Sequence, residues 1–164
     1  MKILGIDPGI AIMGYGVVEF EANKVKVIEN GVVTTSSKTT TPERLSILYK
    51  NLNEIIKEFK PDEFAIEELF FNQNVKTAIT VGHARGIQIL SAQENNLPIY
   101  EYTPLQIKQA ITGYGRANKS QMQKTVTTLL NLKEIPKPDD AADALSVALC
   151  HALSQRFKEN FRMN

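Results

Sequence analysis

Hydrophobic and polar positions along the chain follow two spacings, which alternate as in an α/β protein. Residues 2–7 (KILGID) predict a short buried strand that a Pro-Gly pair ends. Residues 14–20 and 24–35 are rich in β-branched side chains, and the turn-like residues 21–23 separate them. The pattern therefore predicts three strands paired as an antiparallel meander.

Helical spacing takes over in the middle of the chain. From Thr41-Pro42-Glu43 to about Phe59 the apolar positions recur as in an amphipathic helix, with Thr41 as its N-cap. Residues 63–67 predict a fourth strand, residues 75–95 a long helix and residues 98–102 a fifth strand. Because strand–helix–strand crossovers join parallel neighbours, the later strands are expected to pair in parallel under a cover of helices.

The last third of the chain is predicted to be helical, over residues 103–112, 118–131 and 139–157. The expected fold is α/β, a five-stranded mixed sheet with helices on both faces. One domain should span residues 1–157, with residues 158–164 as a frayed C-terminal tail.

Composition narrows the class of protein. The residues are 43% hydrophobic and 23% charged, which is typical of a globular protein. The length of 164 residues suits one domain and is too short for a two-lobed nucleotide-binding enzyme. The lone cysteine, Cys150, lies in an apolar run and is expected to be a buried thiol. The first residues lack the length of a signal peptide, and no window suits a membrane helix, so the cytoplasm is the expected compartment.

Acidic residues follow two of the predicted strands. Asp7 ends the first strand, where α/β sheets usually place their chemistry, although it could also shape the turn that follows. Glu67 and Glu68 end the fourth strand and point to opposite faces of it, and alternation alone does not choose between them.

A third acidic group opens the last helix. Asp140 and Asp143 share a helical face, while Asp139 could join them or serve as the N-cap. An acid at position 143, among alanines and leucine, stands where apolar packing is expected. Gathered in one place, such carboxylates repel one another unless a cation lies among them, and oxygen ligands favour Mg²⁺ or Mn²⁺.

Four motifs together resemble those of the RuvC family of crossover-junction endodeoxyribonucleases. They are residues 3–9 (ILGIDPG) with 14–17 (GYGV), residues 64–68 (FAIEE), residues 108–109 (KQ) with 119–121 (KSQ), and residues 140–145 (DAADAL). The first motif also opens actin-like ATPases and sugar kinases. The four in order are highly specific and span nearly the whole chain.

The resemblance implies a ribonuclease H-like fold, a homodimer, and resolution of Holliday junctions, which are four-way DNA junctions, by paired symmetric nicks. Its catalytic and metal-binding carboxylates correspond to Asp7, Glu67, Asp140 and Asp143. Two Mg²⁺ ions, with Mn²⁺ as a substitute, would promote hydrolysis that leaves a 5′-phosphate and a 3′-hydroxyl. Similar enzymes act in DNA recombination and repair with the branch-migration proteins RuvA and RuvB.

Candidate DNA contacts lie in two segments. By the family's spacing, Phe70 is the candidate wedge at the junction centre, where an exposed aromatic ring can stack on bases. Residues 103–133 contain five basic residues and no acid, so the formal net charge of +1 hides a basic face. The expected phosphate contacts within that segment are Lys108, Arg116, Lys119 and Lys124.

Three other functions fit parts of the pattern. A ribonuclease H-like nuclease acting on other nucleic acids would have the same acidic site. A fragment related to actin-like ATPases would need a second lobe, and a non-catalytic junction-binding module would not need all four acids. His83 and His151 are interpreted as packing or surface residues rather than metal ligands.

Overall fold

The computed structural model describes residues 1–69 and 75–163, with the backbone alone for residues 75–77. Five strands form one sheet in the order β3-β2-β1-β4-β5. β1 pairs antiparallel with β2, and β2 with β3, whereas β1–β4 and β4–β5 are parallel. The strands are β1 (Lys2–Asp7), β2 (Ile12–Glu21), β3 (Lys24–Thr34), β4 (Glu63–Glu67) and β5 (Ile99–Tyr102). The predicted meander and the predicted parallel pairing are both confirmed.

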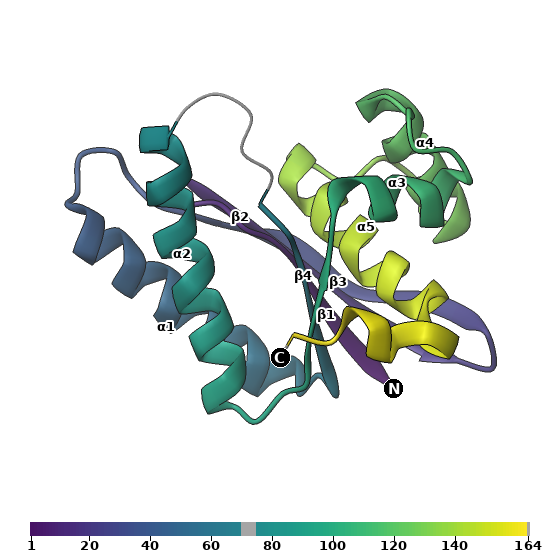
Figure 1. Ribbon diagram of the computed structural model, residues 1–164, viewed down its shortest axis with the longest axis horizontal. Coiled ribbons are helices and arrows are strands. Elements are labelled where there is room, and N and C mark those ends of the chain that lie inside the picture. The colour runs from purple at the N-terminus through teal and green to yellow at the C-terminus, as the bar shows by residue number, and fades with distance from the viewer. Residues whose placement is uncertain (70–74, 164) are drawn as a thin grey trace.

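Helices cover both faces of the sheet, as predicted (Figure 1). On one face lie α1 (Thr41–Phe59) and α2 (Val75–Glu94), which bury the apolar cluster around Leu4, Ile6 and Leu52. On the other face lie the three later helices, over the cluster around Ile3, Tyr102 and Leu149. These helices are α3 (Pro104–Thr112), α4 (Lys119–Leu129) and α5 (Asp139–Leu153).

Glycines let α5 lie directly on β1 and β2. A Cβ atom added at Gly5 would come within 2.5 Å of the Ala144 carbonyl oxygen, and one at Gly14 within 2.0 Å of the Asp140 carbonyl oxygen. No side chain fits between the helix and the strands at these points. The first turn of α5 is therefore held against the end of β1.

The predicted start of α3 is confirmed, whereas the N-cap of α1 lies one residue earlier than predicted. Thr103 caps α3 with its side chain, and Pro104 is the first residue of that helix. The N-cap of α1 is Thr40 rather than Thr41, because Glu43 and Thr40 form the reciprocal capping box.

Cys150 is buried as expected, and burial raises the pKa of its thiol to about 12. Among the described helices, none has the length and hydropathy needed to cross a membrane.

The expectation of a frayed tail after residue 157 is wrong for residues 158–163. After α5 ends at Leu153, a 3-10 helix η1 (Gln155–Phe161) packs back on the sheet. The Phe161 ring lies 4.7 Å from the ring of Tyr102, and the Met163 amide donates to the Ile99 carbonyl oxygen at 2.9 Å. Ring packing and backbone pairing thus fix this segment against β5.

Candidate active site

The carboxyl ends of β1 and β4 bring two acids together. The strands are in register with Ile6 opposite Ile66, so the following residues, Asp7 and Glu67, are neighbours. Residues two apart on a strand share a face, and Gly5, two before Asp7, lies against α5. Both carboxylates therefore face α5, whereas Glu68 alternates to the other face. The strand geometry favours Glu67 where the sequence left both acids open.

The first turn of α5 supplies the other acids. The helix begins at Asp139 after the N-cap Pro138, so Asp139 is its first residue rather than its cap. Asp139 is exposed, and its carboxylate accepts hydrogen bonds from Gln123 and Lys119. Asp143, one turn on, lines the same pocket as Glu67. Asp140 lies close enough for its charge to raise the pKa of Asp7.

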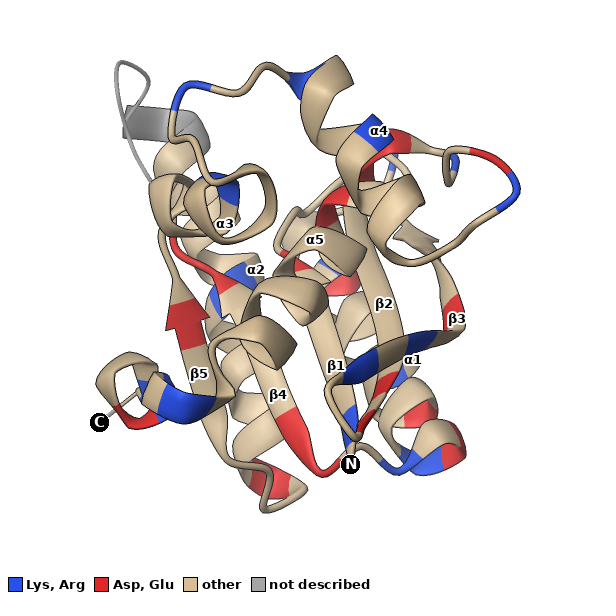
Figure 2. Ribbon diagram, turned by 90° about the vertical axis from the view of Figure 1, so that its right-hand side faces the viewer, with Lys and Arg blue, Asp and Glu red and all other residues tan. Residues whose placement is uncertain are grey.

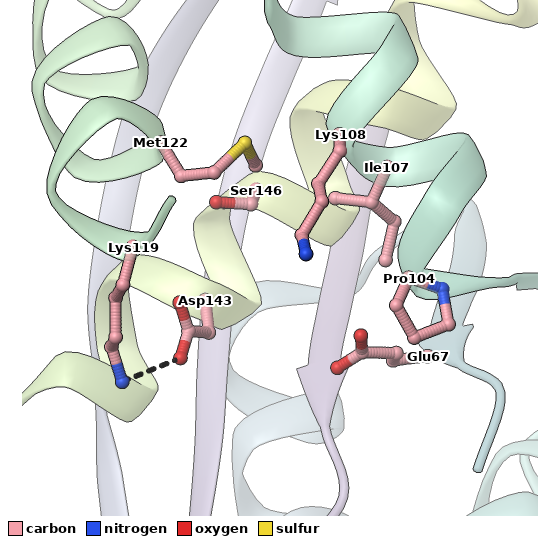
Figure 3. A pocket seen from close by; sticks show the side chains of 8 residues that line it. All are labelled: Glu67, Pro104, Ile107, Lys108, Lys119, Met122, Asp143 and Ser146. Atoms are coloured by element: carbon pink, nitrogen blue, oxygen red, sulfur yellow. Dashed lines mark ion pairs between the residues drawn. The ribbon is translucent and has the colours of Figure 1, made fainter. Parts of the chain in front are cut away.

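A pocket of about 280 Å³ opens between β4 and the three later helices (Figure 3). Glu67 and Asp143 project into it, and Lys108 extends its amine into the same space. Helical spacing could have indicated Ser146, which lies three residues after Asp143, while nothing in the sequence singled out Met122. The lining residues are Glu67, Pro104, Ile107, Lys108, Lys119, Met122, Asp143 and Ser146.

The pKa values of three of these carboxyl groups, Asp7, Glu67 and Asp143, are raised above their ordinary range. Burial, together with the negative charges of Glu67, Asp143 and Asp140, raises the pKa of Asp7 to about 8. Burial and the charge of Asp143 raise the pKa of Glu67 to about 7, although Lys108 acts in the opposite direction. Burial also raises the pKa of Asp143. Such a cluster is one that an added positive charge stabilises.

Lys119 supplies a positive charge at the rim of the pocket. Its amine lies 3.3 Å from a carboxylate oxygen of Asp143 and 3.1 Å from one of Asp139 (Figure 3). The sequence predicted Lys119 as a DNA contact, which stays a prediction, and in this structure Lys119 bridges two acids. Its side chain is 55% exposed, so it can exchange these partners for another anion.

The donor set fits a hard divalent cation in chemistry, because carboxylate oxygens are the ligands that Mg²⁺ and Mn²⁺ prefer. Within residues 1–69 and 75–163, however, no three acidic, histidine or cysteine side chains already converge closely enough to hold an ion. Asp143 is instead paired with Lys119, whose amine lies 3.3 Å from one of its carboxylate oxygens. Rotation of these side chains is what the site needs to bind a cation.

The other predicted phosphate contacts lie on α3, on α4 and in the loop between them, where Figure 2 shows basic residues. Lys108 on α3 is half-buried at the pocket, whereas Arg116 in the α3–α4 loop and Lys124 on α4 are exposed. With Lys119 at the start of α4, they place positive charges beside the acidic cluster. Phe70, the predicted wedge, lies outside the described residues.

The two histidines take the structural places expected of them. His83 is exposed on α2. His151 on α5 is fully buried at the far end of the sheet, where its ring contacts the Tyr102 hydroxyl at 2.6 Å and the Glu63 carboxylate at 2.7 Å. Nothing in the local sequence indicated the Glu63 partnership, because the two residues are 88 positions apart.

Comparison with known proteins gives one consistent result. The family model described as "Crossover junction endodeoxyribonuclease RuvC" matches residues 3–151. A protein of that name from Finegoldia magna is 61% identical over 96% of this chain and 96% of its own length. One from Alkaliphilus oremlandii is 60% identical over 99% of both chains. The solved structure of Thermus thermophilus RuvC in complex with a Holliday junction substrate superposes with a TM-score of 0.90, at 35% identity, covering 99% of this chain and 100% of that one.

Proposed function

The chain belongs to the RuvC family of crossover-junction endodeoxyribonucleases, and we propose that it cuts DNA with the carboxylates of Asp7, Glu67, Asp140 and Asp143. It has the ribonuclease H-like fold of that family and is a nuclease that resolves Holliday junctions in DNA recombination and repair. The observation behind the proposed site is the meeting of Asp7 and Glu67 at the ends of two parallel strands, opposite Asp143.

These residues would hold two Mg²⁺ ions, for which Mn²⁺ can substitute. Bound there, the ions would activate a water for attack on the phosphorus and stabilise the departing 3′ oxygen. Asp7 and Glu67 lie on rigid strands and fix one side of the site, while Asp143 closes it from α5. Because Asp143 also pairs with Lys119, a cation bound to Asp143 would compete with Lys119, and a DNA phosphate is an anion that Lys119 can then contact.

The basic residues around the pocket would hold the DNA backbone. Lys108 projects into the pocket beside Glu67, so it is suited to the scissile phosphate, where a cation also stabilises developing charge. Arg116 and Lys124 are exposed farther out and are suited to neighbouring phosphates. Phe70 remains the proposed wedge at the junction centre.

Two paired nicks require two sites, so the proposal includes a homodimer. The exposed side of α2 offers a surface for it, because Cβ atoms added at Gly82 and Gly86 would meet no neighbouring atom, and Ile79 and Leu90 are about half exposed there. Close helix packing uses such small residues. Cooperation with RuvA and RuvB and a cytoplasmic location complete the proposal.

The test is cleavage and binding of a synthetic four-way junction by the same preparation of Asp7→Asn. We expect nicking in Mg²⁺ to be lost while gel-shift affinity in Ca²⁺ stays within about threefold of the wild type, because Asp7 is assigned to metal and not to DNA. Near-normal nicking would remove Asp7 from the site.

Substrate choice separates this function from that of a nuclease for other nucleic acids. Wild-type protein should nick four-way junctions symmetrically and leave linear duplexes and RNA–DNA hybrids intact. Equal turnover on all three substrates would contradict the resolvase assignment, and end-labelling of the products checks the 5′-phosphate and 3′-hydroxyl.

A further inference from the structure

Arg85 on α2 reaches the end of β4 from the face opposite the carboxylate pocket. Its Nε atom donates to the backbone carbonyl oxygen of Glu67 at 3.1 Å, and its Nη2 atom lies 2.7 Å from a carboxylate oxygen of Glu101 on β5. The Arg85 side chain is only 17% exposed. A guanidinium held by two partners in this way is fixed in position.

The sheet explains why the Glu67 carbonyl needs this donor. The amides of Phe64 and Glu68 donate to Pro98 and Tyr102 beside β5, so the even-numbered residues of β4 face β5. The odd-numbered ones, Glu67 included, face β1.

Asp7 is the residue of β1 opposite Glu67, given that Ile6 pairs with Ile66. In a parallel pair of strands, the Glu67 carbonyl oxygen would accept a hydrogen bond from the backbone N–H of the residue after Asp7. The next residue is Pro8, which has no N–H to donate. Arg85 therefore takes the place of the missing backbone donor.

We propose that Arg85 is a positioning residue for the metal site, which holds the end of β4 so that the Glu67 carboxylate stays beside Asp7. This role rests on the proposed carboxylate metal site. After Glu67, the chain leaves the sheet within two residues. Without Arg85, the last carbonyl of β4 would be unsatisfied and the strand end free to shift.

The test compares four variants with the wild type in the absence and presence of DNA. Mn²⁺ affinity is measured without DNA, by electron paramagnetic resonance of the free ion. The single-turnover nicking rate of a pre-bound four-way junction is then followed against Mg²⁺ concentration. Thermal unfolding of each metal-free protein reports on the fold alone.

For Arg85→Ala we expect Mn²⁺ affinity to fall about tenfold and the Mg²⁺ midpoint to rise about tenfold, with most of the rate restored at high Mg²⁺. Arg85→Lys should fall between this variant and the wild type, because one ammonium cannot reproduce the guanidinium fork. Glu101→Gln should change Mn²⁺ affinity less than threefold, since the Nε bond to Glu67 remains.

Arg44→Ala is the matched control. Arg44 is also partly buried and also donates from Nε, but to the Thr35 hydroxyl at 2.8 Å and not to any of the four proposed metal ligands. It should lower the melting temperature without changing Mn²⁺ affinity.

An Arg85→Ala protein that melts earlier yet binds Mn²⁺ with wild-type affinity would overturn the positioning role alone. If Arg85→Ala does not fold, wild-type Mn²⁺ affinity in a folded Arg85→Lys would have the same meaning. A wild-type protein that fails to bind Mn²⁺ would instead overturn the carboxylate metal site itself.

Discussion

Two glutamates on one strand have pKa values that are shifted in opposite directions. Glu63 begins β4 and Glu67 ends it, and both face α5. Burial alone would raise the pKa of Glu63, but hydrogen bonds from His151, Lys158 and Gln155 outweigh it and lower that pKa to about 2. Burial and the charge of Asp143 raise the pKa of Glu67 to about 7.

The difference lies in what α5 presents at its two ends. Near its C-terminus, α5 places His151 against Glu63, and the tail adds Lys158 as an ion-pair partner. At its N-terminus, it brings further carboxylates toward Glu67 and Asp7. At the Glu63 end of the sheet, the carboxylate therefore has hydrogen-bond and ion-pair partners that stabilise the fold. At the Glu67 end, neighbouring carboxylates repel one another, which favours binding of a cation.

The largest expected effect separates the two glutamates by activity. We expect Glu67→Gln to lower the nicking rate of a four-way junction at least about 1,000-fold, since it removes a proposed metal ligand. Glu63→Gln should stay within about threefold, measured well below its melting temperature. A nicking rate of Glu67→Gln within tenfold of wild type would contradict the assignment of Glu67, but not Glu63, to the metal site.

Glu63→Gln, which should keep its activity, should instead lose stability. Glu63→Gln removes the charge that the buried His151 and the partly buried Lys158 face, at a cost of about 2–3 kcal/mol in the free energy of unfolding at pH 7. Because the folded pKa of Glu63 is depressed, its contribution exists above pH 4.5 and disappears as the pH falls toward 2. Urea denaturation across that window should show the two proteins converging, and parallel curves would contradict the network.

At the other end of the sheet, removing a charge should stabilise the metal-free protein. The raised pKa of Asp7 means that the folded state holds a proton which the unfolded state has lost, so stability declines as the pH rises from about 4 toward 8. Asp7→Asn should therefore raise the free energy of unfolding at pH 8 by about 1–2 kcal/mol, allowing for partial solvent screening. A lower free energy of unfolding for Asp7→Asn at pH 8 would show that the carboxylates do not repel one another in the folded protein.

The sequence predicted the elements well because their signals are local. The Pro-Gly pair after β1 and the Thr-Pro start of α3 are decided by neighbouring residues. Face selection at Glu67 and Glu68 was not local, because it depends on which face of β4 packs on α5. Only the motif resemblance chose Glu67 before the geometry did.

The tail and the Glu63 network could not be predicted from local patterns. Lys158 and Glu63 are 95 residues apart in the chain, and no periodicity connects them. The same is true of Arg85, which donates to the carbonyl oxygen of Glu67 on a different element, 18 residues away in the chain. Long-range polar contacts of this kind arise from the fold, so composition and spacing do not report them.

The smallest effect concerns the pH dependence of metal binding. Ligand carboxylates must lose their protons before they bind a cation, and the pKa values of about 7 for Glu67 and about 8 for Asp7 place that loss in the neutral range. Mn²⁺ affinity measured by calorimetry should rise at least about tenfold between pH 6 and 7. Glu63→Gln should keep this slope, while a slope near zero in the wild type would contradict the raised values.

The most direct measurement is a carbon-13 NMR titration of the glutamate carboxyl groups, assigned with Glu63→Gln and Glu67→Gln. In metal-free protein, Glu67 should titrate near 7 and Glu63 near 2. Added Mg²⁺ should lower the midpoint of Glu67 by well over one unit and leave Glu63 unchanged. A Glu67 that titrates near 4.5 and does not respond to Mg²⁺ would contradict the assignment of this end of the sheet as the metal-dependent nuclease site.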